Sequence, residues 1–165
     1  MKRRSNQLKK RISVIFAALF AAALLTACGE DSELAKFRKS MDDFCTKISE
    51  IDDSINHIDA QSEDATTELL DCLDDLDSTF QNFARLDFPQ EFDYLEDLAD
   101  ESSEYMTEAV KSYHDAYGSD SYDEYTAEYA KQNYSRAYKR IQIIISFLHG
   151  EEPTDADLSI EYQTK

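Results

Sequence analysis

The stretch that decides the fold is LAKFRKSMDDFCTKISEIDDSINHI, residues 34–58. Its apolar residues recur at alternating intervals of three and four, which is the spacing of a narrow apolar seam along one side of an α-helix. They are Leu34, Phe37, Met41, Phe44, Ile48, Ile51, Ile55 and Ile58. The pattern predicts a helix over about 31–59 whose apolar side packs on partner helices.

Three later segments repeat this spacing, and their apolar seams are Leu69, Leu73, Leu76, Phe80 and Phe83, then Phe92, Leu95, Ala99, Ser102, Met106, Ala109, Tyr113 and Ala116, and last Ala127, Ala130, Tyr134, Ala137, Ile141, Ile144 and Leu148. The small residues Ala99 and Ser102 in the middle of the chain's third seam predict that a neighbouring helix can approach closely there.

The helices that these three segments predict span about 62–86, 89–117 and 121–149. Ser62 is expected to cap the first of these, and Pro89 suits the opening turn of the second. The run Ser121-Tyr-Asp-Glu124 has the form of a capping box, in which serine and glutamate side chains bond free N–H groups, and it is expected to start the last helix.

Four amphipathic helices of similar length, joined by short turns, predict an all-α fold. The expected architecture is an antiparallel up-down-up-down four-helix bundle, and the alternative is a set of long helical hairpins that dimerise through the same seams. Only three glycines and two prolines interrupt the chain. Residues 28–150 are expected to form a single domain, and residues 151–165, which are polar and rich in acids, a flexible acidic tail.

The first 28 residues have a different composition. Six basic residues and no acid stand in residues 1–11, and the apolar run Ile12–Ala27 follows. Its sixteen residues are fewer than the roughly 20 that a membrane-spanning helix needs. The order of basic, apolar and small residues is typical of an export signal, and an uncleaved anchor or plain secretion are the alternatives to a lipidated leader.

The run Leu25-Thr-Ala-Cys28 resembles the lipobox of bacterial lipoproteins, a resemblance that covers residues 1–28 alone. It implies that residues 1–27 are removed as a signal peptide and that Cys28 receives fatty acyl chains, palmitate among them. Two or more such chains hold a protein durably at a membrane. The expected location is therefore the extracytoplasmic face of the cell membrane.

Charge excludes two kinds of partner. The leader holds six of the 17 bases and none of the 35 acids, so the mature chain keeps eleven bases and a net charge of −24. Phosphates would repel such a surface, which argues against a nucleic-acid partner. Anionic headgroups would repel it too, so membrane residence has to come from the lipid on Cys28.

The sequence offers no motif for catalysis, a metal or a cofactor. None of the three histidines follows a glutamate by three residues, as di-iron bundles require, and no EF-hand loop or nucleophile motif occurs. We therefore expect no enzyme, no metal centre and no cofactor. The many acids of residues 61–117 suit a solvated face, and they leave open binding of a small ligand or a Ca²⁺-like cation.

Two cysteines remain beyond Cys28, at positions 45 and 72. Cys45 and Cys72 are predicted at similar heights on antiparallel helices, so an exported protein could join them in a disulfide. They also stand on opposite flanks of their seams, which favours the alternative of two small apolar side chains at the edge of the core.

Tyrosine is concentrated in one part of the chain. Eight of the ten tyrosines lie within 34 residues, at Tyr105, Tyr113, Tyr117, Tyr122, Tyr125, Tyr129, Tyr134 and Tyr138. They can complete the core with their hydroxyls in water, or they can form a recognition patch, since tyrosine is common at interfaces. Tyr117, Tyr122, Tyr125 and Tyr129 are the expected contact residues. The tyrosines of positions 122, 125 and 129 are spaced as if on one helical face.

These features together predict a non-enzymatic binding or scaffold module of the cell envelope. Its expected partners are the membrane, through the lipid on Cys28, and an envelope protein, peptide or glycan at the tyrosines. The acidic side of residues 61–117 supplies the alternative, a lipoprotein that binds a small ligand or cation.

Overall fold

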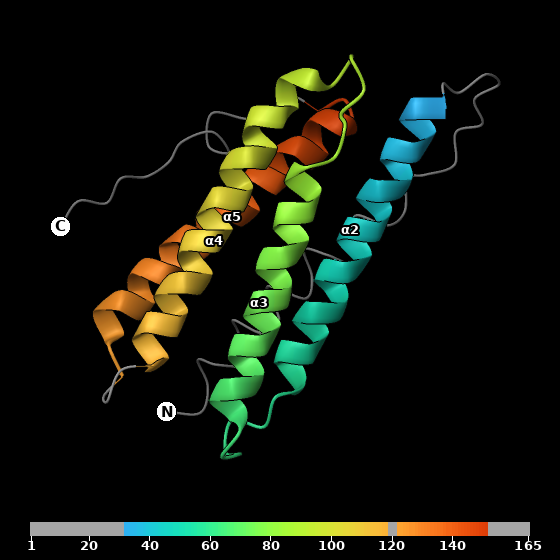
Figure 1. The fold of residues 1–165 in the computed structure, drawn as a ribbon. Coiled ribbons are helices and arrows are strands. Elements are labelled where there is room, and N and C mark those ends of the chain that lie inside the picture. The colour runs from blue at the N-terminus through green and yellow to red at the C-terminus, as the bar shows by residue number, and fades with distance from the viewer. Residues whose placement is uncertain (1–31, 119–121, 152–165) are drawn as a thin grey trace. The chain divides into compact units, whose positions relative to one another are not determined.

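The computed structural model describes residues 32–118 and 122–151. The chain divides into two units, residues 1–32 and 33–165, and all described residues after the first belong to the second unit. This part of the chain forms helices and no strand: α2 (Ser32–His57), α3 (Ala65–Ala84), the 3₁₀ turn η1 (Asp93–Leu95), α4 (Glu96–Gly118) and α5 (Glu124–Leu148) (Figure 1). The all-α helical fold predicted from the heptad spacing is confirmed.

Consecutive helices run antiparallel, as cross-helix contacts show. Between α3 and α4, the Thr107 hydroxyl donates to the Asp77 carboxylate at 2.6 Å, and His114 Nε2 lies 2.8 Å from Asp74 Oδ1. Higher numbers on one helix therefore meet lower numbers on the other. In Figure 1 the start of α3 lies at the same end as the close of α4 and the start of α5, in agreement with an up-down-up-down bundle.

Small residues bring α4 and α5 close together. Ala99 and Ser102 of α4 and Ala130 and Ala137 of α5 are fully buried, and the backbones of these two helices lie near each other over more of their length than those of the other described helices. The Ser102 hydroxyl donates to the Ala137 carbonyl at 2.8 Å. A side chain no larger than a methyl or hydroxymethyl group lets two helix backbones approach in this way, as the small residues of the third predicted seam had indicated.

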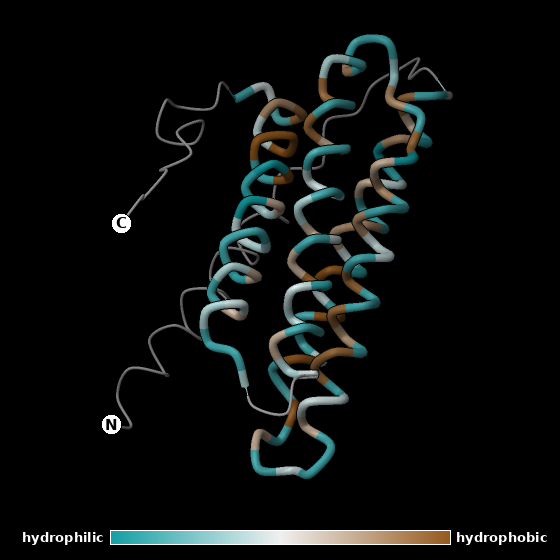
Figure 2. Tube along the Cα trace, turned by 60° about the vertical axis from the view of Figure 1, so that its left-hand side comes forward, coloured by the Kyte–Doolittle hydropathy of each residue, from teal (hydrophilic) through white to brown (hydrophobic). Residues whose placement is uncertain are grey.

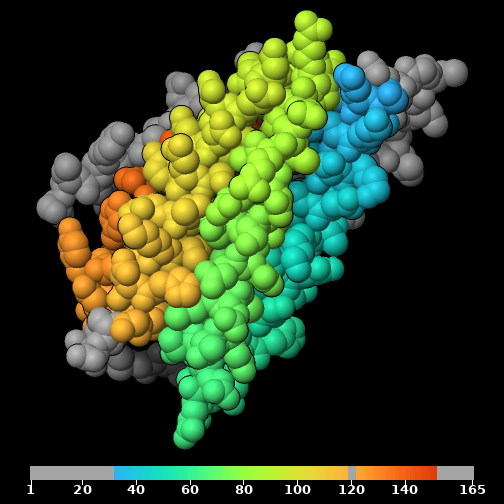
Figure 3. All heavy atoms as spheres, in the orientation of Figure 1, coloured from blue at the N-terminus to red at the C-terminus, as the bar shows by residue number. Residues whose placement is uncertain are grey.

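Large side chains fill the space around α2 instead. The Phe44 ring of α2 lies 4.5 Å from the Phe83 ring and 5.5 Å from the Phe80 ring of α3, centroid to centroid. Phe37 at the start of α2 meets Phe88, beyond the end of α3, at 4.7 Å. Figure 2 shows hydrophobic residues on the sides of the helices that face one another, and in Figure 3 the side chains of α3 stand between α2 and α4.

Several helix ends differ from the sequence prediction. Ser62 is not the cap of α3: its hydroxyl accepts from the Asp64 N–H at 3.2 Å in the preceding turn, and the helix begins at Ala65. Pro89 does not open α4 either. The Phe92 N–H bonds the Pro89 carbonyl at 2.7 Å in a separate turn, η1 follows, and α4 begins at Glu96.

The last helix is capped by a residue inside the predicted capping box. Asp123 is the N-cap of α5, and its carboxylate accepts from the Tyr125 N–H at 3.0 Å and the Thr126 N–H at 3.2 Å. Ser121 lies outside the described residues. The predicted box is therefore wrong in detail: with Asp123 as the N-cap, Glu124 is the first residue of the helix and does not stand at the third helical position that the box requires.

Candidate binding surface

Three tyrosine rings follow one another across the end of α4 toward the start of α5. The centroids of Tyr113 and Tyr117 are 6.5 Å apart in a stacked arrangement, and Tyr117 and Tyr122 are 5.2 Å apart with tilted rings. Such spacings are typical of favourable aromatic pairs. Tyr113 and Tyr117 are half-buried. The row therefore runs from half-buried positions on α4 to the exposed Tyr122.

The next tyrosines are open to solvent. Tyr122, Tyr125 and Tyr129 are 57, 85 and 43% exposed, and they account for three of the four exposed large hydrophobic side chains in the described residues. Tyr125 and Tyr129 are one helical turn apart on α5 and so are neighbours on its surface. Together with Tyr117, these residues form what we call the tyrosine surface.

Tyr122 reaches this surface by a different route from the one expected. It precedes α5, which begins at Glu124, so the helical spacing that relates Tyr125 to Tyr129 does not extend to it. Its place is fixed by the Tyr117 ring and by the neighbouring cap residue Asp123, whose N–H bonds the Ala116 carbonyl at 3.1 Å. The cap thereby ties the end of α4 to the start of α5.

Hydrogen bonds hold the cap residue in its ionised form. The Thr126 hydroxyl donates to the Asp123 carboxylate at 2.8 Å, and this bond, with the N–H groups of Thr126 and Tyr125, lowers the pKa of Asp123 below its ordinary value. The negative charge of Asp123 is also stabilised by the partial positive charge at the N-terminal end of α5. The backbone that carries Tyr122 and Tyr125 is therefore well anchored.

Carboxylates accompany the rings. Glu124 and Glu128 are exposed and stand one helical turn apart on α5, beside Tyr125 and Tyr129. Burial raises the pKa of Tyr113 to about 12, with smaller contributions from the neighbouring tyrosines and from the Glu128 carboxylate. Glu128 consequently lies within electrostatic reach of the α4 row as well. The Lys131 ammonium binds the Glu128 carboxylate at 3.2 Å.

Other tyrosines complete the core. The rings of Tyr134 and Tyr138 lie 4.7 Å apart, and Tyr138 also meets the Phe80 ring at 5.5 Å. Burial raises the pKa of both hydroxyls far above the ordinary range. The two interpretations of the tyrosine cluster therefore both apply, to different members: the rings near the middle of α5 are core, and those at its start are surface.

A carboxylate beside these core rings escaped the sequence analysis. Burial, and secondarily the charge of Asp53, raises the pKa of Asp52 on α2 to about 6, and the Tyr138 hydroxyl acts in the opposite direction. That hydroxyl is buried and has no partner in hydrogen-bond geometry within the described residues. Asp52 directly follows the seam residue Ile51, which is the signal that it stands at the edge of the core.

A buried arginine was missed as well. Arg140 is 6% exposed, its Nε donates to Glu101 at 2.9 Å, and its guanidinium lies 4.8 Å from the centre of the Tyr105 ring. The arginine thereby connects α5 to α4 by a charge-assisted hydrogen bond and a cation–π contact. Its position directly before the seam residue Ile141 is the only sequence signal of its burial.

The two described cysteines are free thiols. Cys45 and Cys72 form no disulfide in the structure, which matches their prediction as small side chains at the core edge. Burial raises the pKa of each thiol, and nearby carboxylates, Asp42 for the first and Asp75 most strongly for the second, act in the same direction. Such thiols are poor nucleophiles.

The acidic side of α3 and α4 does not converge on a cation site. Within residues 32–118 and 122–151, no group of three or more aspartate, glutamate, histidine or cysteine side chains is placed to hold a metal ion. Two of the α3 carboxylates are engaged across the interface, Asp74 with His114 and Asp77 with Thr107. The arrangement is that of a solvated face with cross-helix polar contacts.

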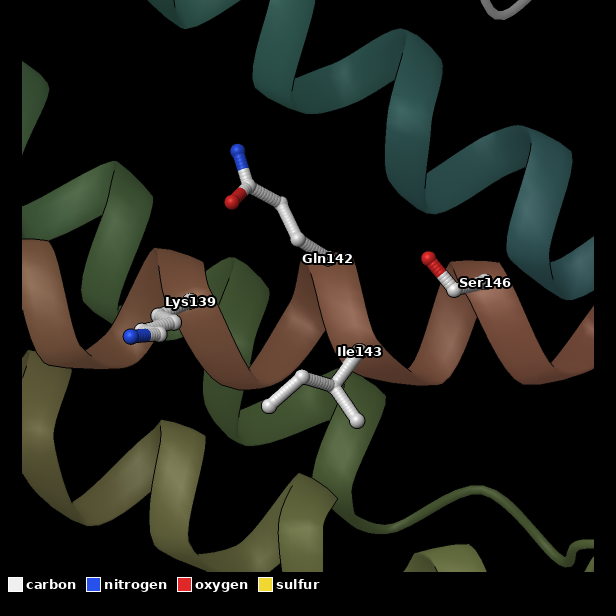
Figure 4. Close-up of a pocket in the computed structure, with 4 residues that line it drawn as sticks. All are labelled: Lys139, Gln142, Ile143 and Ser146. Carbon is white, nitrogen blue, oxygen red and sulfur yellow. The ribbon is translucent and has the colours of Figure 1, made fainter. Parts of the chain in front are cut away.

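A shallow hollow lies along α5 (Figure 4). Its volume is about 70 Å³, and it is lined by Lys139, Gln142, Ile143 and Ser146. Gln142 and Ser146 point to one side of the helix and Ile143 to the other. Sites for small molecules generally need several hundred cubic ångströms, so this hollow is too small for such a ligand.

Comparison with protein-family models, curated proteins and solved structures finds no match. Cys28 and the rest of the leader lie outside the described residues, as do residues 152–165 of the expected acidic tail. No helix in the described part of the chain is long and apolar enough to span a bilayer. The features that bear on function are therefore the surface chemistry of the bundle and the leader sequence.

Proposed function

We propose that the protein is a lipid-anchored, non-enzymatic binding module of the cell envelope that contacts its partner through the tyrosine surface. The observation that carries the proposal is the gathering of Tyr122, Tyr125 and Tyr129 at one end of the helix pair α4–α5, where their rings are open to solvent. Exposed rings on a well-anchored backbone give large contact area at a small cost in conformational entropy.

The leader supports the anchoring part of the proposal. Lipidation at Cys28 would place the start of α2, only a few residues later, near the membrane. The antiparallel order then puts the start of α3, the close of α4 and the start of α5 at the opposite end of the bundle, which is where the tyrosine surface lies. A binding surface at the membrane-distal end is accessible to partners in the envelope.

Cross-linked capture from intact cells tests the binding role. The unaltered protein is compared with a Tyr122→Ala/Tyr125→Ala variant, and with Tyr94→Ala as the matched control. Tyr94 is 56% exposed, as Tyr122 is 57% exposed, but it lies on η1. We expect a discrete partner with the unaltered protein and with the control, and its loss with the double variant. Equal recovery from all three proteins would exclude the tyrosine surface as the working site.

Membrane fractionation tests the anchor separately. A Cys28→Ser variant cannot carry the thioether-linked lipid, so we expect it to retain the full-length leader and to stay in the membrane fraction through the apolar run of that leader. The unaltered protein is expected there without residues 1–27 and with the added mass of acyl chains. The helicity of the domain, measured by circular dichroism, should be unchanged, because the described bundle begins at Ser32. A full-length leader on the unaltered protein as well, measured by mass spectrometry of the membrane fraction, would show that the leader acts as an uncleaved anchor.

A further inference from the structure

We infer that the tyrosine surface recognises a basic polypeptide segment, one that presents lysine or arginine side chains to the rings and carboxylates of α5. This inference rests on the proposed function and narrows it to one chemistry of partner. It is based on the arrangement of rings and charges at the start of α5, where both kinds of group are exposed.

Rings and carboxylates form parallel rows along the first turns of α5. Tyr125 and Tyr129 are separated by four residues, and so are Glu124 and Glu128, so each pair runs along the helix and the two pairs stand side by side. The charge of Glu128 contributes to the raised pKa of Tyr113, so its carboxylate also lies within electrostatic reach of the tyrosine row of α4. The carboxylates are therefore flanked by aromatic rings.

This pairing of groups is the one that binds an organic cation. The face of a tyrosine ring attracts an ammonium or guanidinium group, and a neighbouring carboxylate adds a charge-assisted hydrogen bond. The protein already makes both contacts among its own residues: Lys131 binds Glu128 at 3.2 Å within this surface, and the Arg140 guanidinium lies over the Tyr105 ring at 4.8 Å farther along α5. The Lys131–Glu128 pair is well exposed, so an incoming cation can replace it at little cost.

Net charge favours the same partner. The whole chain carries −18 at neutral pH and the mature part −24, so a basic segment is attracted from a distance and an acidic one is repelled. A neutral glycan could stack on the rings but would gain nothing from the charge. A chain of alternating basic residues gains from both, which is why we choose the polypeptide.

Isothermal titration calorimetry on the full, lipidated chain in a non-ionic detergent tests the inference. The probe is a short, capped peptide of alternating lysine and serine. Its comparison ligands are the same peptide with glutamate for lysine, and a β-1,4-linked oligomer of N-acetylglucosamine. We expect binding of the lysine peptide alone. Circular dichroism establishes that each variant keeps its helicity.

Uncharged substitutions separate recognition from general attraction. Tyr125→Ala and Tyr129→Ala leave the net charge unchanged. We expect each to lower the affinity for the lysine peptide about two- to fivefold, which is the usual contribution of one exposed ring to binding of a cation. Glu128→Gln should weaken it to a similar extent. Tyr94→Ala, the matched exposed tyrosine, should have no effect.

Each other outcome overturns the inference in a recognisable way. Equal affinity of all tyrosine variants for the lysine peptide would mean diffuse attraction to an acidic surface. Tyrosine-dependent binding of the glycan would refute the basic partner and leave the proposed function intact. The same holds if no probe binds although cellular capture still depends on Tyr122 and Tyr125. Failure of the capture itself refutes the proposed function.

Discussion

The two halves of this bundle are assembled by opposite means. α4 and α5 meet through alanines and Ser102, with backbones close enough for a side chain to bond the facing helix at 2.8 Å. α2 instead meets α3 through phenylalanine rings with centroids 4.5–5.5 Å apart. We therefore expect the α4–α5 interface to be sensitive to added side-chain volume and the α2–α3 interface to be sensitive to lost side-chain volume.

Removing an aromatic ring from the α2–α3 interface should have the largest effect on stability. Phe80 is 1% exposed and contacts both Phe44 and Tyr138, so Phe80→Ala leaves a cavity among three helices. We expect the free energy of unfolding to fall by about 3–5 kcal/mol, measured by urea denaturation. A loss below about 1 kcal/mol would show that α2 collapses into the vacated space.

Adding side-chain volume to the α4–α5 interface should have the second-largest effect on stability. Ala137 is fully buried, and its carbonyl accepts from Ser102, so Ala137→Leu forces α4 and α5 apart at a cost of about 1–3 kcal/mol in the free energy of unfolding. Ala35→Leu, at an exposed position of α2, is the control and should be neutral. Equal stability of the two variants would refute close packing between α4 and α5.

Asp52 gives the packing of α2 a dependence on pH. Its pKa is raised from 3.8 to about 6, so the folded state binds a proton more tightly than the unfolded state, and its contribution to stability is lost as pH rises through that interval. Asp52→Asn should therefore stabilise the protein at pH 7 and not at pH 4. Because water screens a partly exposed carboxylate, the expected gain is about 1 kcal/mol.

Thermal denaturation of Asp52→Asn and the unaltered protein across that pH range measures the effect. The comparison is made as a difference at each pH, because protonation of the many other acids also changes the stability of both proteins. An Asp42→Asn variant is the control, since Asp42 is exposed on the same helix and ten residues away, whereas the charge of Asp53 itself contributes to the raised pKa of Asp52. A constant difference between pH 4 and pH 7 would contradict the raised pKa.

The smallest effect concerns one hydrogen bond. Ser102→Ala removes the bond to the Ala137 carbonyl, and we expect a loss of about 0.5–1.5 kcal/mol in the free energy of unfolding. Alanine is the better helix former, so Ser78→Ala, an exposed serine of α3, supplies the correction for propensity. If the two variants differ by nothing, the hydroxyl fills space and does not bind.

The heptad spacing was sufficient to predict the helices and the residues of their seams. Phe37, Leu76 and Ile144, for example, were each placed in a seam, and each is buried. Spacing succeeds for such positions because a helix that buries one stripe leaves little freedom in which residues compose it. The size of the seam residues also predicted where two helices come close.

The burial of side chains beside the seams could not be predicted from the sequence. Whether Asp52 or Arg140 is buried depends on the bulk of the side chains on the facing helices, which determines how far the covered stripe extends. Helix starts were equally uncertain, since Ser62, Asp64 and Asp123 are all competent caps and only the path of the turn selects among them. The exposure of Tyr122 follows from such a start.

The crowding of tyrosines has a spectroscopic consequence. The chain contains ten tyrosines and no tryptophan. Its intrinsic ultraviolet fluorescence therefore comes from tyrosine and is not quenched by energy transfer to tryptophan. Tyr113, Tyr117 and Tyr122 lie 6.5 and 5.2 Å apart in sequence of contact, close enough to exchange excitation and depolarise their own light. Tyr134 and Tyr138, 4.7 Å apart, exchange excitation in the same way, so polarised emission reports on the packing of the tyrosines of α4 and α5 without any attached label.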